Sequence, residues 1–134
     1  MTPVDQSKLY TSDGIHNGNC FAACLGSLLD LPLWMVPPFD QMFGRGGWHE
    51  RTQEWLSRFF SLEMVRTEGP EWEDLPEFYI ANGPGPRGVY HSVIHSRGEL
   101  VHDPHPSRSG ILVVDWYWSL RPSGARTPIA PERK

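Results

Sequence analysis

The sequence has few cysteines and no long apolar run, and both facts limit what the protein can be. Two cysteines in 134 residues cannot form a disulfide framework, and they are too few for a zinc site unless histidines join them. No apolar run reaches the roughly 18–20 residues of a membrane-spanning helix. Residues 1–5 lack the basic and apolar regions of a signal peptide. We therefore expect a reduced, cytoplasmic protein without a membrane partner.

Positive charge is also scarce. The formal net charge is −4, and no cluster of five or more Lys or Arg occurs, which argues against nucleic-acid binding through a basic patch. Hydrophobic residues make up 39% of the chain, as in globular proteins, while 13 Gly and 13 Pro indicate many loops. The length favours a single domain spanning 1–134, with 122–134 as a flexible tail.

One stretch stands out because it has almost no polar face. Between Asn19 and Asp30 only Ser27 is plainly polar, which predicts a helix buried nearly all round. Asn19 or Asn17 could cap its N-terminus. A central helix of this kind would organise the rest of the fold.

Cys20 falls in the first turn of this predicted helix. There the helix dipole and the unpaired backbone N–H groups stabilise a thiolate and lower its pKa. Several thiol enzymes place their nucleophile in this way, although a buried cysteine is more often a small apolar core residue. Cys24 lies one turn further along the helix and is expected to pack in the core.

The remaining pattern predicts an α+β domain. A second helix is expected from residue 48 to about 61, because Trp48, Trp55, Leu56 and Phe59 recur at helical spacing. Short β-like segments follow at 62–66, 78–81, 89–95, 99–103 and 111–120. We expect the buried helix to pack on an antiparallel sheet of four to five strands.

The segments 89–95 and 99–103 form the clearest β-hairpin signal. A three-residue loop ending at Gly98 would pair His91 directly with Asp103. The carboxylate could then fix the tautomer of the imidazole and stabilise the imidazolium, leaving the other ring nitrogen for Cys20. A two-residue turn at Arg97-Gly98 would instead pair His91 with Pro104 and remove this contact.

Each of these residues also has an ordinary structural interpretation. His91 could be an edge histidine bonded to a backbone carbonyl, and Asp103 a turn residue before Pro104. His102, Asp103 and His105 could hold a metal, but their spacing matches none of the standard zinc patterns, and we expect no metal or cofactor. The joint placement of Cys20, His91 and Asp103 favours catalysis.

The order Cys20, His91, Asp103 resembles the papain-like cysteine peptidase superfamily, which has a Cys at the start of a central helix, then a His on a strand, then an Asn or Asp on or after the next strand. Residues 91–94 followed by 101–104 are similar to the bacteriocin-processing branch. Asn17-Gly18-Asn19-Cys20 is similar to the Asp-Gly-Asn-Cys motif of ovarian-tumour-type deubiquitinases. The resemblance implies a papain-like fold with a Cys20–His91–Asp103 triad.

The resemblance is incomplete around the oxyanion hole. The papain and bacteriocin-processing branches carry a Gln a few residues before the cysteine, where this chain has Gly14 and Ile15. Asn17 stands where the ovarian-tumour motif has Asp. The resemblance therefore implies that Asn17, or its neighbourhood, and the backbone N–H of Cys20 stabilise the oxyanion.

The expected activity is cysteine-dependent hydrolysis of an amide bond in a peptide or protein substrate, as by a peptidase or amidase. The same triad could instead pass the acyl group to an amine, as transglutaminases and arylamine acetyltransferases do. A third possibility is a papain-like scaffold that only binds a partner through its Trp-rich surface, since Trp116 and Trp118 could form either core or the wall of a groove.

Overall fold

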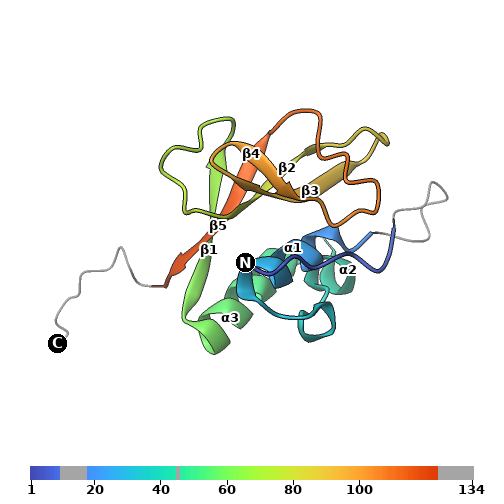
Figure 1. Ribbon diagram of the computed structural model, residues 1–134. Coiled ribbons are helices and arrows are strands. Elements are labelled where there is room, and N and C mark those ends of the chain that lie inside the picture. Colours follow the sequence, from blue (N-terminus) through green and yellow to red (C-terminus); the bar gives the residue numbers. More distant parts are fainter. Residues whose placement is uncertain (10–17, 45, 124–134) are drawn as a thin grey trace.

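A layer of helices lies against one antiparallel sheet in the computed structural model, which describes residues 1–9, 18–44 and 46–123 (Figure 1). The helical elements are α1 (Cys20–Leu29), the 3₁₀ turn η1 (Leu33–Met35), α2 (Phe39–Phe43) and α3 (Trp48–Phe60). The strands are β1 (Leu62–Glu68), β2 (Tyr79–Pro84), β3 (Tyr90–Ser96), β4 (Glu99–His102) and β5 (Trp116–Pro122). Among the described residues they form a five-stranded sheet in the order β1-β5-β2-β3-β4. The expected α+β class, with a helix packed on such a sheet, is confirmed.

Helix α1 is buried along almost its whole length, as its sequence predicts. Every residue from Phe21 to Ser27 is buried. Asn19 stands at the N-cap position, but its side chain makes no cap hydrogen bond. Its Oδ1 instead accepts the backbone N–H groups of Ser7 and Lys8, at 3.0 and 2.9 Å. The N-terminal segment is thereby tied to the start of α1. The predicted N-cap position of Asn19 is confirmed, although its side chain bonds the N-terminal segment instead of the first turn of the helix.

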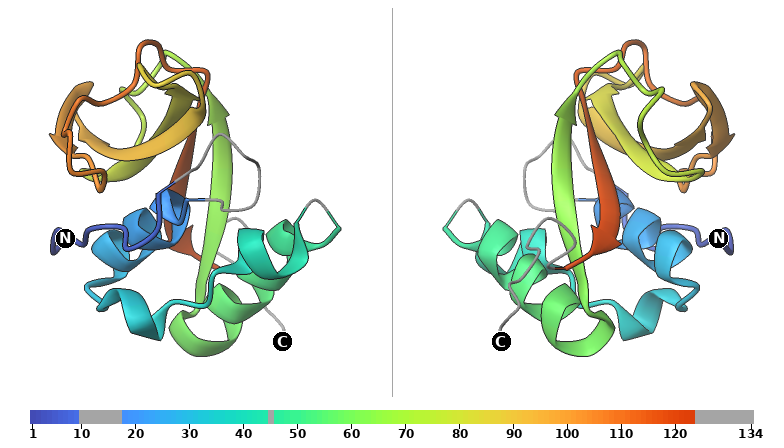
Figure 2. Two further views of the ribbon diagram at one scale, coloured as in Figure 1. Left: turned by 90° about the vertical axis from the view of Figure 1, so that its right-hand side faces the viewer. Right: turned by 90° about the vertical axis from the view of Figure 1, so that its left-hand side faces the viewer.

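Both faces of the sheet carry apolar clusters. On the helical side, Leu25 and Leu56 belong to one cluster with Ile80 and Ile94 of the sheet. On the other side, Tyr79 and the cluster around it pack under the two long connections that precede β2 and follow β4; its buried members are Tyr79, Ala81, Val93 and Tyr117. Figure 2 shows how the sheet curves so that β3 and β4 close over the side opposite the helices. The curvature lets a short chain bury two cores.

Several element boundaries differ from the sequence prediction. Helix α2 was not predicted, because Pro37-Pro38 and a five-residue length leave no helical period to detect. Strand β2 continues through Asn82-Gly83-Pro84, which reads as a breaker in the sequence. The expected tail also begins too early, since Pro122 is the last residue of β5. Residues 124–134 lie outside the described residues.

The segment 111–115 was predicted to begin the last strand and does not. It contacts β2 through two isolated backbone hydrogen bonds. Leu112 N–H donates to the Pro84 carbonyl and Asp115 N–H donates to the Asn82 carbonyl, both at 2.8 Å. Between them the Val113 carbonyl lies over Gly83 so closely that a Cβ there would be 1.9 Å from its oxygen. The apolar run therefore covers the end of β2 instead of extending β5.

We expect Gly83→Ala to destabilise the protein by about 3 kcal/mol, because the new methyl group would force the crossing segment away from β2. Urea unfolding monitored by tryptophan fluorescence measures the loss. Gly46→Ala is the matched control, since its Cβ would meet no atom closer than 3.7 Å. Equal stability of the two variants would contradict the close contact at Gly83.

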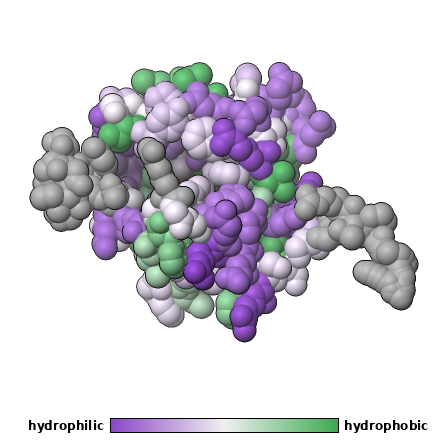
Figure 3. All heavy atoms as spheres, turned by 180° about the vertical axis from the view of Figure 1, so that it is seen from behind, coloured by the Kyte–Doolittle hydropathy of each residue, from purple (hydrophilic) through white to green (hydrophobic). Residues whose placement is uncertain are grey.

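Hydrophilic and apolar patches alternate on the back of the molecule (Figure 3). Among the described residues, no helix has the length and apolar character needed to cross a membrane.

Candidate active site

Cys20 begins α1 and opens onto a large cavity of the described structure. The residue is half-buried, and it lines a cavity of about 660 Å³ together with His91, Asp40 and Trp116. Cys24, one turn deeper, is 0% exposed, and burial raises the pKa of its thiol. The two cysteines therefore differ in access: Cys20 faces a space that a ligand can enter, and Cys24 belongs to the core.

The hairpin that carries His91 does not have the predicted loop. Arg97 and Gly98 form a two-residue turn with φ values of 52° and 79°, so Ser96 pairs with Glu99. The ladder then shifts, because His95 pairs with Leu100 but Ile94 pairs with His102. Val101 is left as a β-bulge without a partner on β3.

This bulge brings Asp103 to the same side of the hairpin as His91. After a two-residue turn, an unbroken ladder would place Asp103 opposite Ser92 and hence on the other face from His91. The extra residue moves the register by one, so that Asp103 follows on opposite Val93 and reaches His91 diagonally. The predicted direct pairing of His91 with Asp103 was wrong, but the two side chains meet.

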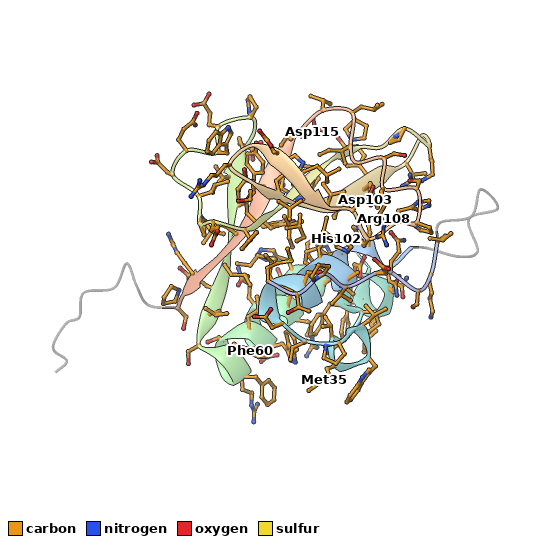
Figure 4. All side chains as sticks on the ribbon, viewed as in Figure 1. Met35, Phe60, His102, Asp103, Arg108 and Asp115 are labelled. Atoms are coloured by element: carbon orange, nitrogen blue, oxygen red, sulfur yellow. The ribbon has the colours of Figure 1, made fainter. Side chains whose placement is uncertain are left out.

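Asp103 is the centre of a buried hydrogen-bond cluster. Its Oδ1 accepts from His91 Nε2 at 2.6 Å and from the His105 backbone N–H at 2.9 Å, and its Oδ2 accepts from the Gly110 backbone N–H at 2.7 Å. Arg108 donates to the Asp103 carbonyl and is paired with Asp5. Figure 4 shows Asp103 and Arg108 close together where β4 ends above the helical layer. The loop after β4 is thus folded around one carboxylate.

The three side chains influence each other's ionisation. Burial by itself would lower the pKa of His91, but hydrogen bonds to Asp103 and Cys20, together with the charges of both, raise it to about 9. Burial would raise the pKa of Asp103, and the hydrogen bonds from His91, His105 and Gly110 lower it to about 2. Because Asp103 occupies His91 Nε2, the ring nitrogen left for the Cys20 sulfur is Nδ1. The arrangement favours the imidazolium form of His91, which the carboxylate of Asp103 stabilises.

Several other residues that line the cavity were not predicted from the sequence, or were given another role. The ring of His105 meets that of His91 edge to face at 6.1 Å. Trp116 forms a wall of the cavity, stacked on Tyr90 at 5.7 Å, while Trp118 belongs to the core. Asp40 comes from α2, which carries no periodic signal. No motif in the sequence points to Asp40, because its place in the site depends on how α2 packs.

Another histidine considered in the sequence, His102, makes contacts with the N-terminal segment. His102 Nε2 donates to the Val4 carbonyl at 2.9 Å and also lies 3.3 Å from the Asp5 carboxylate. Within the described residues no group of three or more His, Cys, Asp or Glu is arranged to hold a metal ion. Asn17, expected at the oxyanion hole, lies outside the described residues.

The functional inference depends on these side chains, since comparison of the chain with protein-family models, with curated proteins and with solved structures finds no match.

Proposed function

We propose that the protein is a cysteine-dependent amide-bond hydrolase, a peptidase or amidase with a papain-like fold. The observation that carries the proposal is the chain of contacts from the Cys20 sulfur through His91 to Asp103, at the wall of a 660 Å³ cavity. A nucleophile, a base that reaches it and a third group that orients the base are the parts of an activated thiol. Two of these three groups, His91 and Asp103, are buried polar residues that form a hydrogen bond with each other.

In the first half of the reaction Cys20 is the nucleophile. His91 holds the thiol proton, and the sulfur attacks the substrate carbonyl carbon to give a tetrahedral intermediate. His91 then passes the proton to the leaving nitrogen, so the C–N bond breaks, the amine departs and a thioester to Cys20 remains. Asp103 stabilises the imidazolium through its 2.6 Å bond to Nε2 and keeps Nδ1 directed at the sulfur.

In the second half water replaces the amine. His91 Nδ1 removes a proton from water, the hydroxide oxygen attacks the thioester carbonyl, and the C–S bond breaks. The carboxylic acid leaves, the sulfur is released as a thiolate, and His91 keeps the proton taken from water, so the pair returns to its starting state. The backbone N–H groups in the first turn of α1 are the nearest fixed positive ends of dipoles for the oxyanion, because the Asn19 side chain does not cap them.

The papain-like assignment is supported by topology. The nucleophile begins the buried helix, the histidine lies near the start of β3, and the carboxylate follows β4, the next strand. The curved antiparallel sheet and the helical layer meet along the cavity that holds Cys20 and His91. This arrangement matches the order of parts that the sequence resemblance implies.

Alkylation by iodoacetamide tests the activated thiol without knowledge of the substrate. In a Cys24→Ala background Cys20 is the single thiol. We expect it to react at least about tenfold faster than glutathione at pH 6, where a free thiol with a pKa near 8.5 is almost fully protonated. His91→Ala in the same background should remove most of this advantage. A Cys20 that reacts no faster than glutathione would contradict the proposal.

A further inference from the structure

Unpaired polar atoms are concentrated in the walls of the Cys20 cavity. Four buried side-chain nitrogen or oxygen atoms of the described residues lack a hydrogen-bond partner, and three of them, Gln6 Oε1, Asp40 Oδ1 and Trp116 Nε1, belong to residues that line this cavity. Buried polar groups are nearly always paired in folded proteins. These atoms have almost no accessible surface themselves, so they lie just behind the cavity wall and mark residues whose hydrogen bonding within the described structure is incomplete.

Asp40 is the residue among the three that carries a charge. It lies in the first turn of α2, and burial raises the pKa of its carboxyl group, partly offset by the backbone N–H groups of Asp40 and Gln41. No cationic side chain is among the groups that act on it in the described structure. Gln41 donates to the Gly18 carbonyl at 3.0 Å, so α2 is held beside the start of α1. Among the described residues the carboxylate therefore has no cationic partner, and α2 places it in the wall of the cavity that Cys20 also lines.

The wall of the cavity also contains a cationic side chain. Arg87, from the turn between β2 and β3, lines it and donates to Ser107 Oγ at 3.0 Å. His105 lies there as well, against His91. A ligand in the cavity therefore meets the carboxylate of Asp40, from α2, and the guanidinium of Arg87, from the turn between β2 and β3. Ligands of opposite charge should therefore bind at different places in the cavity: cations near Asp40 and anions near Arg87.

We infer that Asp40 binds a positively charged group of the substrate, next to the carbonyl that Cys20 attacks. The inference rests on the proposed function and adds a substrate class to it: peptides or amides with an ammonium or guanidinium group close to the scissile bond. The carboxylate of Asp40 in the cavity wall would hold the cation by a charge-assisted hydrogen bond. Asp40 is then a specificity-determining residue.

Charged thiol reagents test this inference without any hydrolysis. Methanethiosulfonates that carry an ammonium group, a sulfonate group or no charge are reacted with Cys20 in the Cys24→Ala background, and each rate is divided by the rate with free cysteine. We expect the normalised rate with the ammonium reagent to be about ten times that with the sulfonate reagent. In Asp40→Asn this ratio should fall at least about fivefold. Glu54→Gln is the matched control, because it removes an equal charge from an exposed site on α3 outside the cavity.

The outcomes separate this inference from the proposed function. A normalised ratio near one, or a ratio unchanged by Asp40→Asn, overturns the inference even if the uncharged reagent shows an activated thiol. A ratio that Asp40→Asn abolishes and Glu54→Gln preserves supports it even if Cys20 is slow with every reagent, a result that would count against the hydrolase. Once hydrolysis is measured, peptides with a lysine and a blocked N-terminus, or with norleucine and a free N-terminus, distinguish a side-chain cation from a terminal amine.

Discussion

Replacing Cys20 with alanine should lower amide hydrolysis by about 10⁴-fold or more, because no other thiol faces the cavity. Replacing His91 with alanine should cost nearly as much, since the sulfur then loses both the group that accepts its proton and the group that protonates the leaving nitrogen. The measurement is the initial rate of fluorophore release from a mixture of peptide amides that includes cationic residues.

The double variant makes this prediction specific. Residues that act as one unit have strongly non-additive effects, so Cys20→Ala combined with His91→Ala should be about as slow as either single variant. Cys24→Ala is the control, because that side chain is buried in the core and makes no contact with the cavity. Full activity of Cys20→Ala would rule out a thiol mechanism. Additive losses would indicate that His91 acts by supporting the fold.

The parts of the fold that the sequence predicted well are those in which one local pattern decides the outcome. The absence of a polar face identified α1 as a buried helix, and its observed bounds, Cys20–Leu29, lie within one residue of the prediction. The apolar residues at helical spacing identified α3 equally well. In both helices the side chains that create the pattern are the ones that pack, so local and tertiary preferences agree.

The hairpin was predicted less well because two local deviations compensate each other. Arg97 and Gly98 both adopt a positive φ, which gives the shorter turn, and Val101 is then inserted as a bulge. An arginine such as Arg97 does not indicate a positive φ in the sequence. The contact between His91 and Asp103 survives because what matters for it is which face each side chain occupies, and the turn and the bulge together restore that face.

The cavity was beyond prediction from sequence. Asp40, Gln6 and Trp116 come from α2, the N-terminal segment and β5, which are distant in the chain and belong to no common motif. They meet because α2 is held against the start of α1 and because the segment 111–115 ends where it covers Gly83. The residue types and their order pointed to Cys20 and His91 as candidate site residues, whereas the walls of the cavity follow from long-range packing.

Replacing Asp103 with asparagine should lower the hydrolysis rate by about 10²–10⁴-fold near neutral pH. The amide keeps the size of the side chain but loses the charge that helps hold the pKa of His91 near 9. The pKa of His91 should therefore fall, because burial then acts with less opposition, and the basic limb of the pH–rate profile should move from about 9 to a lower pH. A profile of kcat/KM against pH for both proteins measures the shift.

The same substitution should flatten the pH dependence of stability. The pKa of Asp103 is lowered from 3.8 to about 2, so its stabilising contribution is present above 3.8 and is lost as the pH falls toward 2. The pKa of His91 is raised from 6.5 to about 9, so its contribution is complete below 6.5 and is lost as the pH rises through 9. The free energy of unfolding of the wild-type protein, measured with urea, should be highest between pH 3.8 and 6.5, where both contributions are complete. Asp103→Asn should lower this highest value by about 2 kcal/mol.

Asp115→Asn provides the comparison for both measurements, because this carboxylate lies on the same connection before β5 but accepts its hydrogen bond from Tyr90. It should leave the basic limb near that of the wild-type protein. If Asp103→Asn lowers stability and leaves the basic limb in place, Asp103 serves only to fold the loop through the backbone N–H groups of His105 and Gly110. A shift of the limb in Asp103→Asn alone requires that the carboxylate controls the proton on His91, which is the role the mechanism gives it.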